Sequence, residues 1–245
     1  MIPLRTSVPV DRPTPAVWTL LVVNLLLFLI PATLGPRAYL HFIYEFALVP
    51  ARYAYPDVAR AAGLDPNNFL PLLTNAFLHA GWLHLGVNMW TLWLFGRPLE
   101  ARLGPVRFAI GYLVFGIAAS AGHFAFNLTS TVPALGASGA IAGVLGAFSI
   151  AFPRERVLML FPIGLIPLVW SFPATVYAGI WFIIQMLSGA GNLMQPEYGR
   201  EIAWWAHIGG FLCGLWLAGL LGARPPAPPS RRRIRSPLPE SGRRR

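Results

Sequence analysis

The chain has 245 residues, of which 56% are hydrophobic and only 11% are charged. A water-soluble domain could not bury so much apolar surface, so this composition excludes a soluble globular protein and indicates an integral membrane protein. All 19 basic residues are arginine, against 9 acidic residues, and the basic excess lies near the C-terminus, which indicates a basic tail and argues against a nucleic-acid-binding face.

Six uncharged apolar runs approach the roughly 20 residues that a helix needs to cross a bilayer. We therefore predict an all-α membrane protein with a six-transmembrane-helix bundle over 16–221. The segment 35–80 between the first two runs mixes aromatic and charged residues, which predicts short helices lying in the membrane interface. The six runs lie at about 16–34, 81–96, 108–127, 136–152, 172–189 and 203–221.

The stretch between Arg156 and Glu197 contains no charge and is ambiguous. It is too long for one crossing and barely long enough for two, and three prolines interrupt its first half. We interpret residues 157–170 as interfacial or half-buried, which keeps six crossings. A seventh crossing there would place the tail on the opposite side from the N-terminus.

The arginine distribution favours six crossings. With the N-terminus inside, 15 of the 19 arginines fall on the inner side, and only Arg37, Arg52, Arg60 and Arg200 fall outside. By the positive-inside rule, both the N-terminal segment 1–15 and the tail 222–245 are expected in the cytoplasm. The expected location is a bacterial cell (inner) membrane. The proline- and arginine-rich tail is expected to be disordered and attracted to anionic lipid headgroups.

Four polar side chains stand out within the predicted spans, where polar groups are costly and must find partners. His84 and Asn88 lie in the second span, Ser138 in the fourth and His207 in the sixth. These spans run in the same direction, and three of the residues lie near the outer start of their span. Asn88 follows His84 by one turn on the same helix face. The four side chains are therefore expected to meet near the outer surface.

Each candidate also has a purely structural interpretation. Ser138 stands in a run of small residues typical of close helix packing, and glycines that would allow similar contact follow His207. His84 and Asn88 could join neighbouring helices through hydrogen bonds. The shared depth of the four residues favours a functional cluster. The glycines with a predicted structural role are Gly136, Gly139, Gly210 and Gly214.

The residue types limit the chemistry. All three aspartates lie outside the spans, which excludes a membrane aspartyl protease, and the absence of an HExxH motif argues against a zinc protease. We expect no metal and no cofactor. Ser138, His207, His84 and Asn88 can supply a nucleophile, a base and oxyanion donors, and the glycine-rich turn at a helix N-terminus adds free backbone N–H groups.

The motifs resemble, in order, those of the rhomboid family of intramembrane serine proteases. The resemblance covers about 16–221 and implies a rhomboid-like bundle that hydrolyses peptide bonds in or near the transmembrane segments of single-span substrates, close to the outer membrane face. It also implies a mobile fifth span. The matching motifs are TNAFLHAGWLHLGVN at 74–88, LFGRPLEARLGPVRF at 94–108, GASG at 136–139 and AHIGGFLCG at 206–214.

Carried over to this chain, the resemblance implies that Ser138 is the nucleophile and that His207 is its base and then its acid. It implies that His84, Asn88 and the backbone N–H of Ser138 stabilise the oxyanion. The partners are then transmembrane protein substrates and membrane lipids, with no nucleic acid.

Two residues of the second motif, Glu100 and Arg107, match a structural turn on the cytoplasmic side, where Glu100 could pair with an arginine. The chain also departs from relatives that carry Trp-Arg at 70–71 and tyrosine at position 142. We therefore expect another side chain to hold His207, with Trp204 or Trp205 as candidates.

Two alternatives to a protease stay open at this point. One is a rhomboid-like protein that binds membrane segments without cutting them. The presence of both Ser138 and His207 argues against it, because such a protein would not need the pair. A six-span transporter would show intramembrane charges or paired broken helices near the midplane, and the sequence shows neither convincingly.

Overall fold

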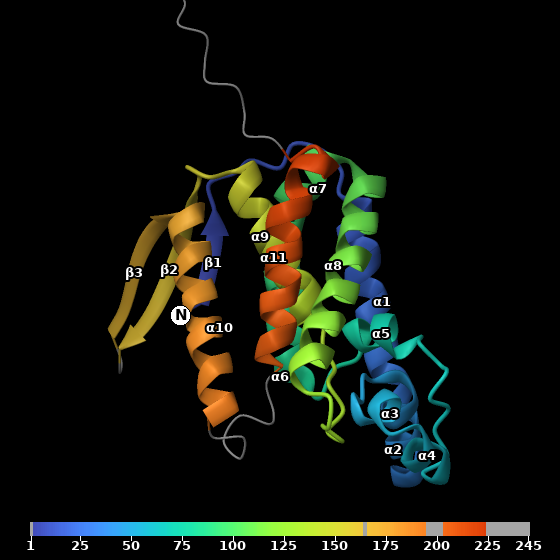
Figure 1. Cartoon of the computed structure of the whole chain (residues 1–245). Coiled ribbons are helices and arrows are strands. Elements are labelled where there is room, and N and C mark those ends of the chain that lie inside the picture. The colour runs from blue at the N-terminus through green and yellow to red at the C-terminus, as the bar shows by residue number, and fades with distance from the viewer. Residues whose placement is uncertain (1, 164–165, 195–202, 224–245) are drawn as a thin grey trace, which may run out of the picture.

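Helices occupy all six ranges in which spans are predicted. The computed structural model describes residues 2–163, 166–194 and 203–223. The six helices are α1 (Pro15–Ala32), α6 (Trp82–Thr91), α8 (Pro105–Phe126), α9 (Ser138–Ala151), α10 (Ala174–Met194) and α11 (Trp204–Leu221). Their directions alternate, so that α6, α9 and α11 rise from the lower end of the molecule in Figure 1 and the other three descend.

Three of these helices, α8, α10 and α11, are long and apolar enough to cross a membrane, and α1 and α9 are shorter apolar helices. The helix that begins with α6 is longer than α6 alone. It continues through η2 (Leu92–Gly96), a π-helical segment, into α7 (Arg97–Leu103). The protein is therefore an integral membrane protein built mainly of helices.

The segment between α1 and α6 contains the predicted short helices. Arg52 anchors them, although the chain lacks the Trp-Arg pair of some relatives. Its buried guanidinium donates to the carbonyl oxygen of Asp65 at 2.8 Å and pairs with the carboxylate of Glu45 at 3.1 Å. Asn68 donates to the other carboxylate oxygen at 2.8 Å. The short helices are α2 (Pro36–Phe46), α3 (Ala51–Ala54), α4 (Pro56–Ala61), α5 (Pro71–Thr74) and the 3₁₀ turn η1 (Asn75–Phe77).

The fold is not all-α, and the prediction was wrong in this respect. An antiparallel sheet of three strands, β1 (Ile2–Thr6), β2 (Arg156–Ile163) and β3 (Ile166–Pro173), lies beside α10 (Figure 1), in the order β1-β2-β3. The stretch 157–170, interpreted as interfacial or half-buried, thus contributes residues 157–163 to β2 and residues 166–170 to β3, and the segment 1–15 contributes a strand. Trp90 of α6 donates a hydrogen bond to the carbonyl oxygen of Pro3 at 2.7 Å, which ties β1 to the bundle.

The physical reason for the error lies in the apolar run itself. A short, continuously apolar segment has no periodicity that separates a buried strand from a helix. In the structure, alternate residues of β2 point into the main core, where Val157 and Met159 are buried. Pro162 lies opposite Pro167 in the register, so two of the sheet residues that cannot donate a ladder hydrogen bond are paired with each other.

The helices α8, α9 and α11 pack closely because glycines face the contacts. A Cβ on Gly210 would collide with the carbonyl oxygen of Gly139, and one on Gly214 with that of Gly143. A Cβ on Gly139 would lie 2.5 Å from the Cβ of Ala119 on α8. Backbones can approach this closely only where side chains are absent. The glycines therefore fix the start of α9 next to the start of α11.

Glu100 closes the opposite end of the bundle. Its side chain is buried, and its two carboxylate oxygens accept hydrogen bonds from the backbone N–H groups of Ala16 and Val17 at 2.9 and 2.7 Å. A carboxylate at the first turn of α1 satisfies N–H groups that have no intrahelical acceptor and complements the helix dipole. The suggested arginine partner is thus replaced by a helix N-terminus. Arg107 is exposed, and its guanidinium lies near Gly222, just beyond α11.

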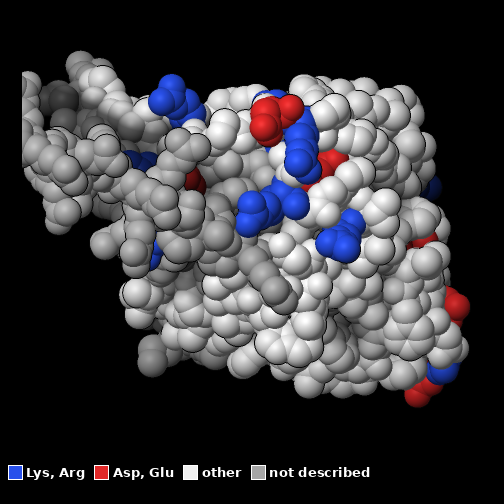
Figure 2. Space-filling view, turned by 90° about the horizontal axis from the view of Figure 1, so that it is seen from above, with Lys and Arg blue, Asp and Glu red and all other residues white. Residues whose placement is uncertain are grey.

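This upper end of the molecule carries basic side chains, as Figure 2 shows in the view from above. The elements that reach it are α7, the start of α8 and the connection from α9 to β2. They contribute Arg97, Arg102, Arg107, Arg154 and Arg156. The greater part of the predicted basic tail, from residue 224 onward, lies outside the described residues.

Candidate active site

Ser138 and His207 meet at the lower end of the bundle. Ser138 is the first residue of α9, and His207 lies in the first turn of α11. The Oγ atom of Ser138 is 2.8 Å from Nε2 of His207, which is within hydrogen-bond distance. The close packing of Gly139 against Gly210 holds the two helix starts together. A hydroxyl and an imidazole in this arrangement can act as nucleophile and base.

The turn that leads into α9 is shaped by Gly136. Its φ of +133° is a conformation that other residues rarely adopt, and its N–H donates to the carbonyl oxygen of Asn75 at 2.9 Å. A Cβ at this position would lie 2.8 Å from Nε2 of His84 and 3.7 Å from Oγ of Ser138. The His84 ring therefore reaches the same turn as the Ser138 hydroxyl, and only glycine leaves room for it.

Asn88 lies one turn further along α6 and is 5% exposed. Its Nδ2 atom is buried and has no hydrogen-bond partner within the described part of the chain. Such a donor costs free energy, on the order of 1–3 kcal/mol, unless a water or ligand satisfies it. The Asn88 amide therefore has a donor that is free to bind a ligand.

His79 supports the ring of His84 from the loop before α6. The two ring centroids are 5.2 Å apart at an interplanar angle of 69°. His79 is buried, and neither ring nitrogen has a partner among the residues that the structure describes. Burial, with a smaller contribution from His84, lowers the pKa of His79 to about 4, so this imidazole is neutral near pH 7.

Gln185 was missed by the sequence analysis. It lies on α10, is 6% exposed, and its Oε1 atom is 2.7 Å from Nδ1 of His207. A signal was available, because a glutamine in the middle of an apolar span is as unusual as the four residues that were selected. This side chain fills the role for which Trp204 and Trp205 were suggested.

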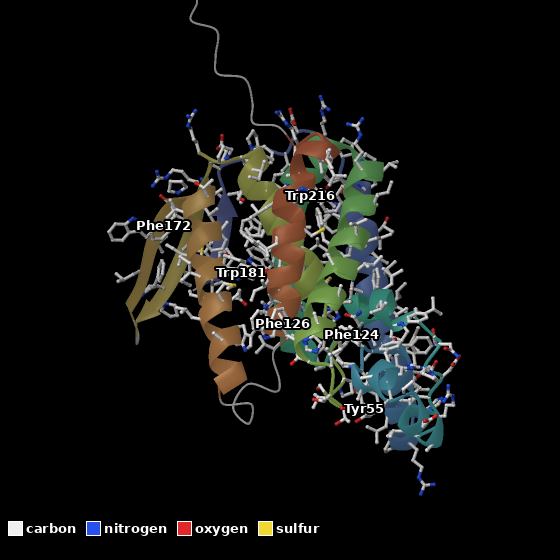
Figure 3. The ribbon with its side chains drawn as sticks, in the orientation of Figure 1. Tyr55, Phe124, Phe126, Phe172, Trp181 and Trp216 are labelled. Carbon is white, nitrogen blue, oxygen red and sulfur yellow. The ribbon has the colours of Figure 1, made fainter. Side chains whose placement is uncertain are left out.

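The tryptophans make different contacts. Trp204 contacts the His207 ring edge-on, with centroids 6.1 Å apart, whereas Trp205 stacks on Phe126 at 3.8 Å. Trp181 projects from α10 toward α11 (Figure 3), where its ring lies 5.9 Å from the His207 ring. The rings of Trp181 and Trp204 therefore border the imidazole of His207, while Gln185 is the residue that forms a hydrogen bond with its Nδ1 atom.

A small cavity adjoins Ser138. Its volume is about 20 Å³, which is room for about one water molecule. Asn75 and His123 line it together with Ser120, whose Oγ atom accepts a hydrogen bond from Nδ2 of Asn75 at 2.8 Å. A water held here would lie beside the hydroxyl of Ser138.

Comparison with known proteins connects this geometry to a family. The family model of the Rhomboid domain matches residues 66–224. Rhomboid protease GluP of Bacillus subtilis is 34% identical over 151 residues, 62% of this chain and 26% of that protein. Rhomboid protein 1, mitochondrial, of Saccharomyces cerevisiae is 32% identical over 150 residues, 60% of this chain and 40% of that protein.

A third relative, presenilin-associated rhomboid-like protein A, mitochondrial, of Danio rerio, is 30% identical over 162 residues, 61% of this chain and 37% of that protein. In each case the chain covers less than half of the relative's length. The relatives come from a bacterium and from mitochondria.

Proposed function

This chain belongs to the rhomboid family, whose members are typically intramembrane serine proteases, and from that premise we propose that it is a serine endopeptidase that cuts membrane-anchored proteins with a Ser138–His207 dyad. The observation that carries the proposal is the 2.8 Å contact between Oγ of Ser138 and Nε2 of His207.

The proposed reaction follows from that contact. Nε2 of His207 accepts the proton of the Ser138 hydroxyl while Oγ attacks the scissile carbonyl carbon. The protonated imidazole then gives this proton to the leaving amine, which leaves an acyl group on Ser138. A water molecule, for which the small cavity beside Ser138 has room, attacks the ester by the same route in reverse and regenerates the hydroxyl.

Three groups support the proposed oxyanion site. The backbone N–H of Ser138 stands at the first position of α9, where it has no intrahelical acceptor and where the helix dipole favours negative charge. The His84 ring borders the same turn, and the Nδ2 atom of Asn88 is an unpaired buried donor. Donors held ready for the developing charge stabilise the transition state more than the ground state.

We further propose six crossings, with the site near the outer surface. The starts of α6, α9 and α11 lie at the end opposite the arginine-bearing end. The positive-inside rule makes the arginine end cytoplasmic, and the start of α1 and the end of α11 lie at that end. A transmembrane helix satisfies its own backbone hydrogen bonds, so its scissile carbonyl becomes accessible only after local unwinding. Single-span substrates with Gly, Ala or Pro near the outer end of the span are therefore favoured.

The decisive experiment compares Ser138→Ala with the wild type in liposomes that contain a tagged single-span substrate. We expect cleavage and labelling by a fluorophosphonate probe in the wild type and neither in the variant. Ser149→Ala is the matched control, because Ser149 is a buried serine on the same helix whose hydroxyl bonds to the Gly146 carbonyl oxygen at 2.7 Å. Undiminished cleavage by Ser138→Ala would refute the proposal, and labelling without cleavage of any substrate would favour a binding protein.

A further inference from the structure

We propose that Gln185 is a positioning residue that selects the reactive tautomer of His207. This inference rests on the proposed function, because it concerns the base of the same dyad. The contact joins two helices, since Gln185 belongs to α10 and His207 to α11. Each ring nitrogen of His207 thus has one partner, Oε1 of Gln185 at 2.7 Å and Oγ of Ser138 at 2.8 Å.

The chemistry of the two partners determines where the imidazole proton resides. An amide oxygen only accepts hydrogen bonds, so the contact with Oε1 requires a proton on Nδ1. In a neutral imidazole, Nε2 then carries the lone pair. This lone pair is what Nε2 needs to accept the hydroxyl proton of Ser138. The opposite tautomer would point an N–H at Oγ and leave the serine without a base.

The surroundings of Gln185 support a fixed orientation. The side chain is 6% exposed, so water offers little competition for its Oε1 atom. Its neighbours along α10 brace the helix against α11, because the rings of Trp181 and Phe182 lie 5.7 and 4.8 Å from the ring of Phe211. This aromatic contact lies one turn before the glutamine and places it within hydrogen-bond distance of His207.

A neutral acceptor differs from the carboxylate that usually performs this task in serine hydrolases. An amide orients the ring without stabilising the imidazolium by a full charge. A glutamate at the same position would keep the orientation and add a negative charge next to the ring. The rate of such a variant would therefore need a higher pH to reach its plateau, since the base must be neutral to act.

The first test is direct and uses the unmodified sequence. Protein labelled with ¹⁵N-histidine is reconstituted in detergent, and the His207 signals are assigned by comparison with His207→Ala. We expect the spectrum of a neutral imidazole protonated on Nδ1. A proton on Nε2 of the free enzyme would overturn the proposal.

The second test uses Gln185→Leu, which removes the acceptor at similar volume, and Gln185→Glu, which restores it. For Gln185→Leu we expect kcat and the rate of fluorophosphonate labelling to fall about 10- to 100-fold with KM little changed. For Gln185→Glu we expect labelling to recover, with the acid limb of its pH profile moved to higher pH. Met186→Leu, at a largely exposed position on α10, is the control and should behave as the wild type.

The outcomes separate this proposal from the proposed function. Wild-type rates in Gln185→Leu would overturn the positioning role alone, provided that Ser138→Ala is inactive. If Gln185→Leu and Gln185→Glu lost rate equally, and the pH profile of Gln185→Glu were not shifted, Gln185 would be a packing residue only. Cleavage by Ser138→Ala would instead refute the dyad itself.

Discussion

The two ends of the helix bundle both bury polar side chains, but they differ in how these are satisfied. At the upper end, both carboxylate oxygens of Glu100 accept backbone hydrogen bonds from the start of α1. One unpaired nitrogen, Nε of Arg97, also lies at the upper end in the described part of the chain. At the lower end, Nδ2 of Asn88 and both ring nitrogens of His79 lack partners in the described part of the chain. Unpaired buried donors reduce stability unless something binds them, so the contrast separates an end built for stability from an end built for a ligand.

The largest effect that tests this contrast is expected for Asn88→Ala. If the amide binds the oxyanion, its loss lowers kcat on the order of 10²-fold or more, as for other single oxyanion donors. Stability should stay unchanged or rise slightly, because an unsatisfied buried donor is removed. Cleavage kinetics in liposomes and thermal unfolding in detergent measure the two quantities.

The matched control is Asn24→Ala. Asn24 is a fully buried asparagine of α1 whose Nδ2 atom donates to the Leu20 carbonyl oxygen at 2.7 Å, while its Oδ1 atom has no partner in the described part of the chain. This variant should lose stability and keep its kcat. If Asn88→Ala behaved like Asn24→Ala, the lower end would be structural as well and the contrast would fail.

The second largest effect is a loss of stability at the upper end of the bundle, in the variant Glu100→Gln. Glu100→Gln removes the charge and places an amide N–H₂ against one of the two backbone donors. We expect a loss of stability of about 2 kcal/mol, because a charge-assisted hydrogen bond is lost and a buried N–H is left unpaired. The kcat per active site should be unchanged, since Glu100 lies at the end of the bundle away from Ser138.

Thermal unfolding and active-site titration with a fluorophosphonate separate these two quantities for Glu100→Gln. Glu155→Gln is the control, because Glu155 lies at the same end and accepts a hydrogen bond from Ser7 in an exposed position. It should change neither quantity. A kcat that fell in proportion to stability only in Glu100→Gln would show that the two ends are coupled.

The sequence predicted that Ser138 and His207 lie close together, as they do, but it did not predict the sheet, and the reason is physical. The length of each apolar run locates a span. Because the fourth and sixth spans cross the membrane in the same direction, Ser138 and His207, each near the start of its span, lie at the same depth. Their proximity can therefore be predicted from the sequence. The sheet does not follow, because the apolar run that contains β2 and β3 has no distinguishing period. A hydrogen-bond partner that is distant in sequence cannot be predicted either. No residue near Glu100 in the sequence indicates that its carboxylate binds the start of α1.

Gln185 illustrates a different kind of omission. The rule that selected His84 and Asn88 also applies to a glutamine within an apolar helix. It belongs to none of the motifs that carry the family resemblance. Its partner, His207, becomes evident only when α10 and α11 are placed side by side. Arg52 is similar, since its backbone and carboxylate acceptors come from α2 and from the loop after α4.

The smallest expected effect is a pH dependence of stability from His79. Its folded-state pKa of about 4 lies below the ordinary value of 6.5, so the unfolded chain binds a proton between these values and the folded chain does not. Stability is therefore complete above about pH 6.5 and decreases as the pH falls toward 4. Between pH 7.5 and 5.5 the decrease from this residue is about 1 kcal/mol.

Replacement of His79 by an uncharged side chain isolates this contribution. In His79→Gln the decrease in thermal stability between pH 7.5 and 5.5 should be smaller than in the wild type, and the difference between the two proteins is the quantity to measure. Because the imidazole packs against His84, kcat is expected to fall modestly in the same variant. An identical pH dependence in both proteins would mean that His79 is solvated or paired in the membrane, and the lower end would then contain one unsatisfied group fewer than the structure indicates.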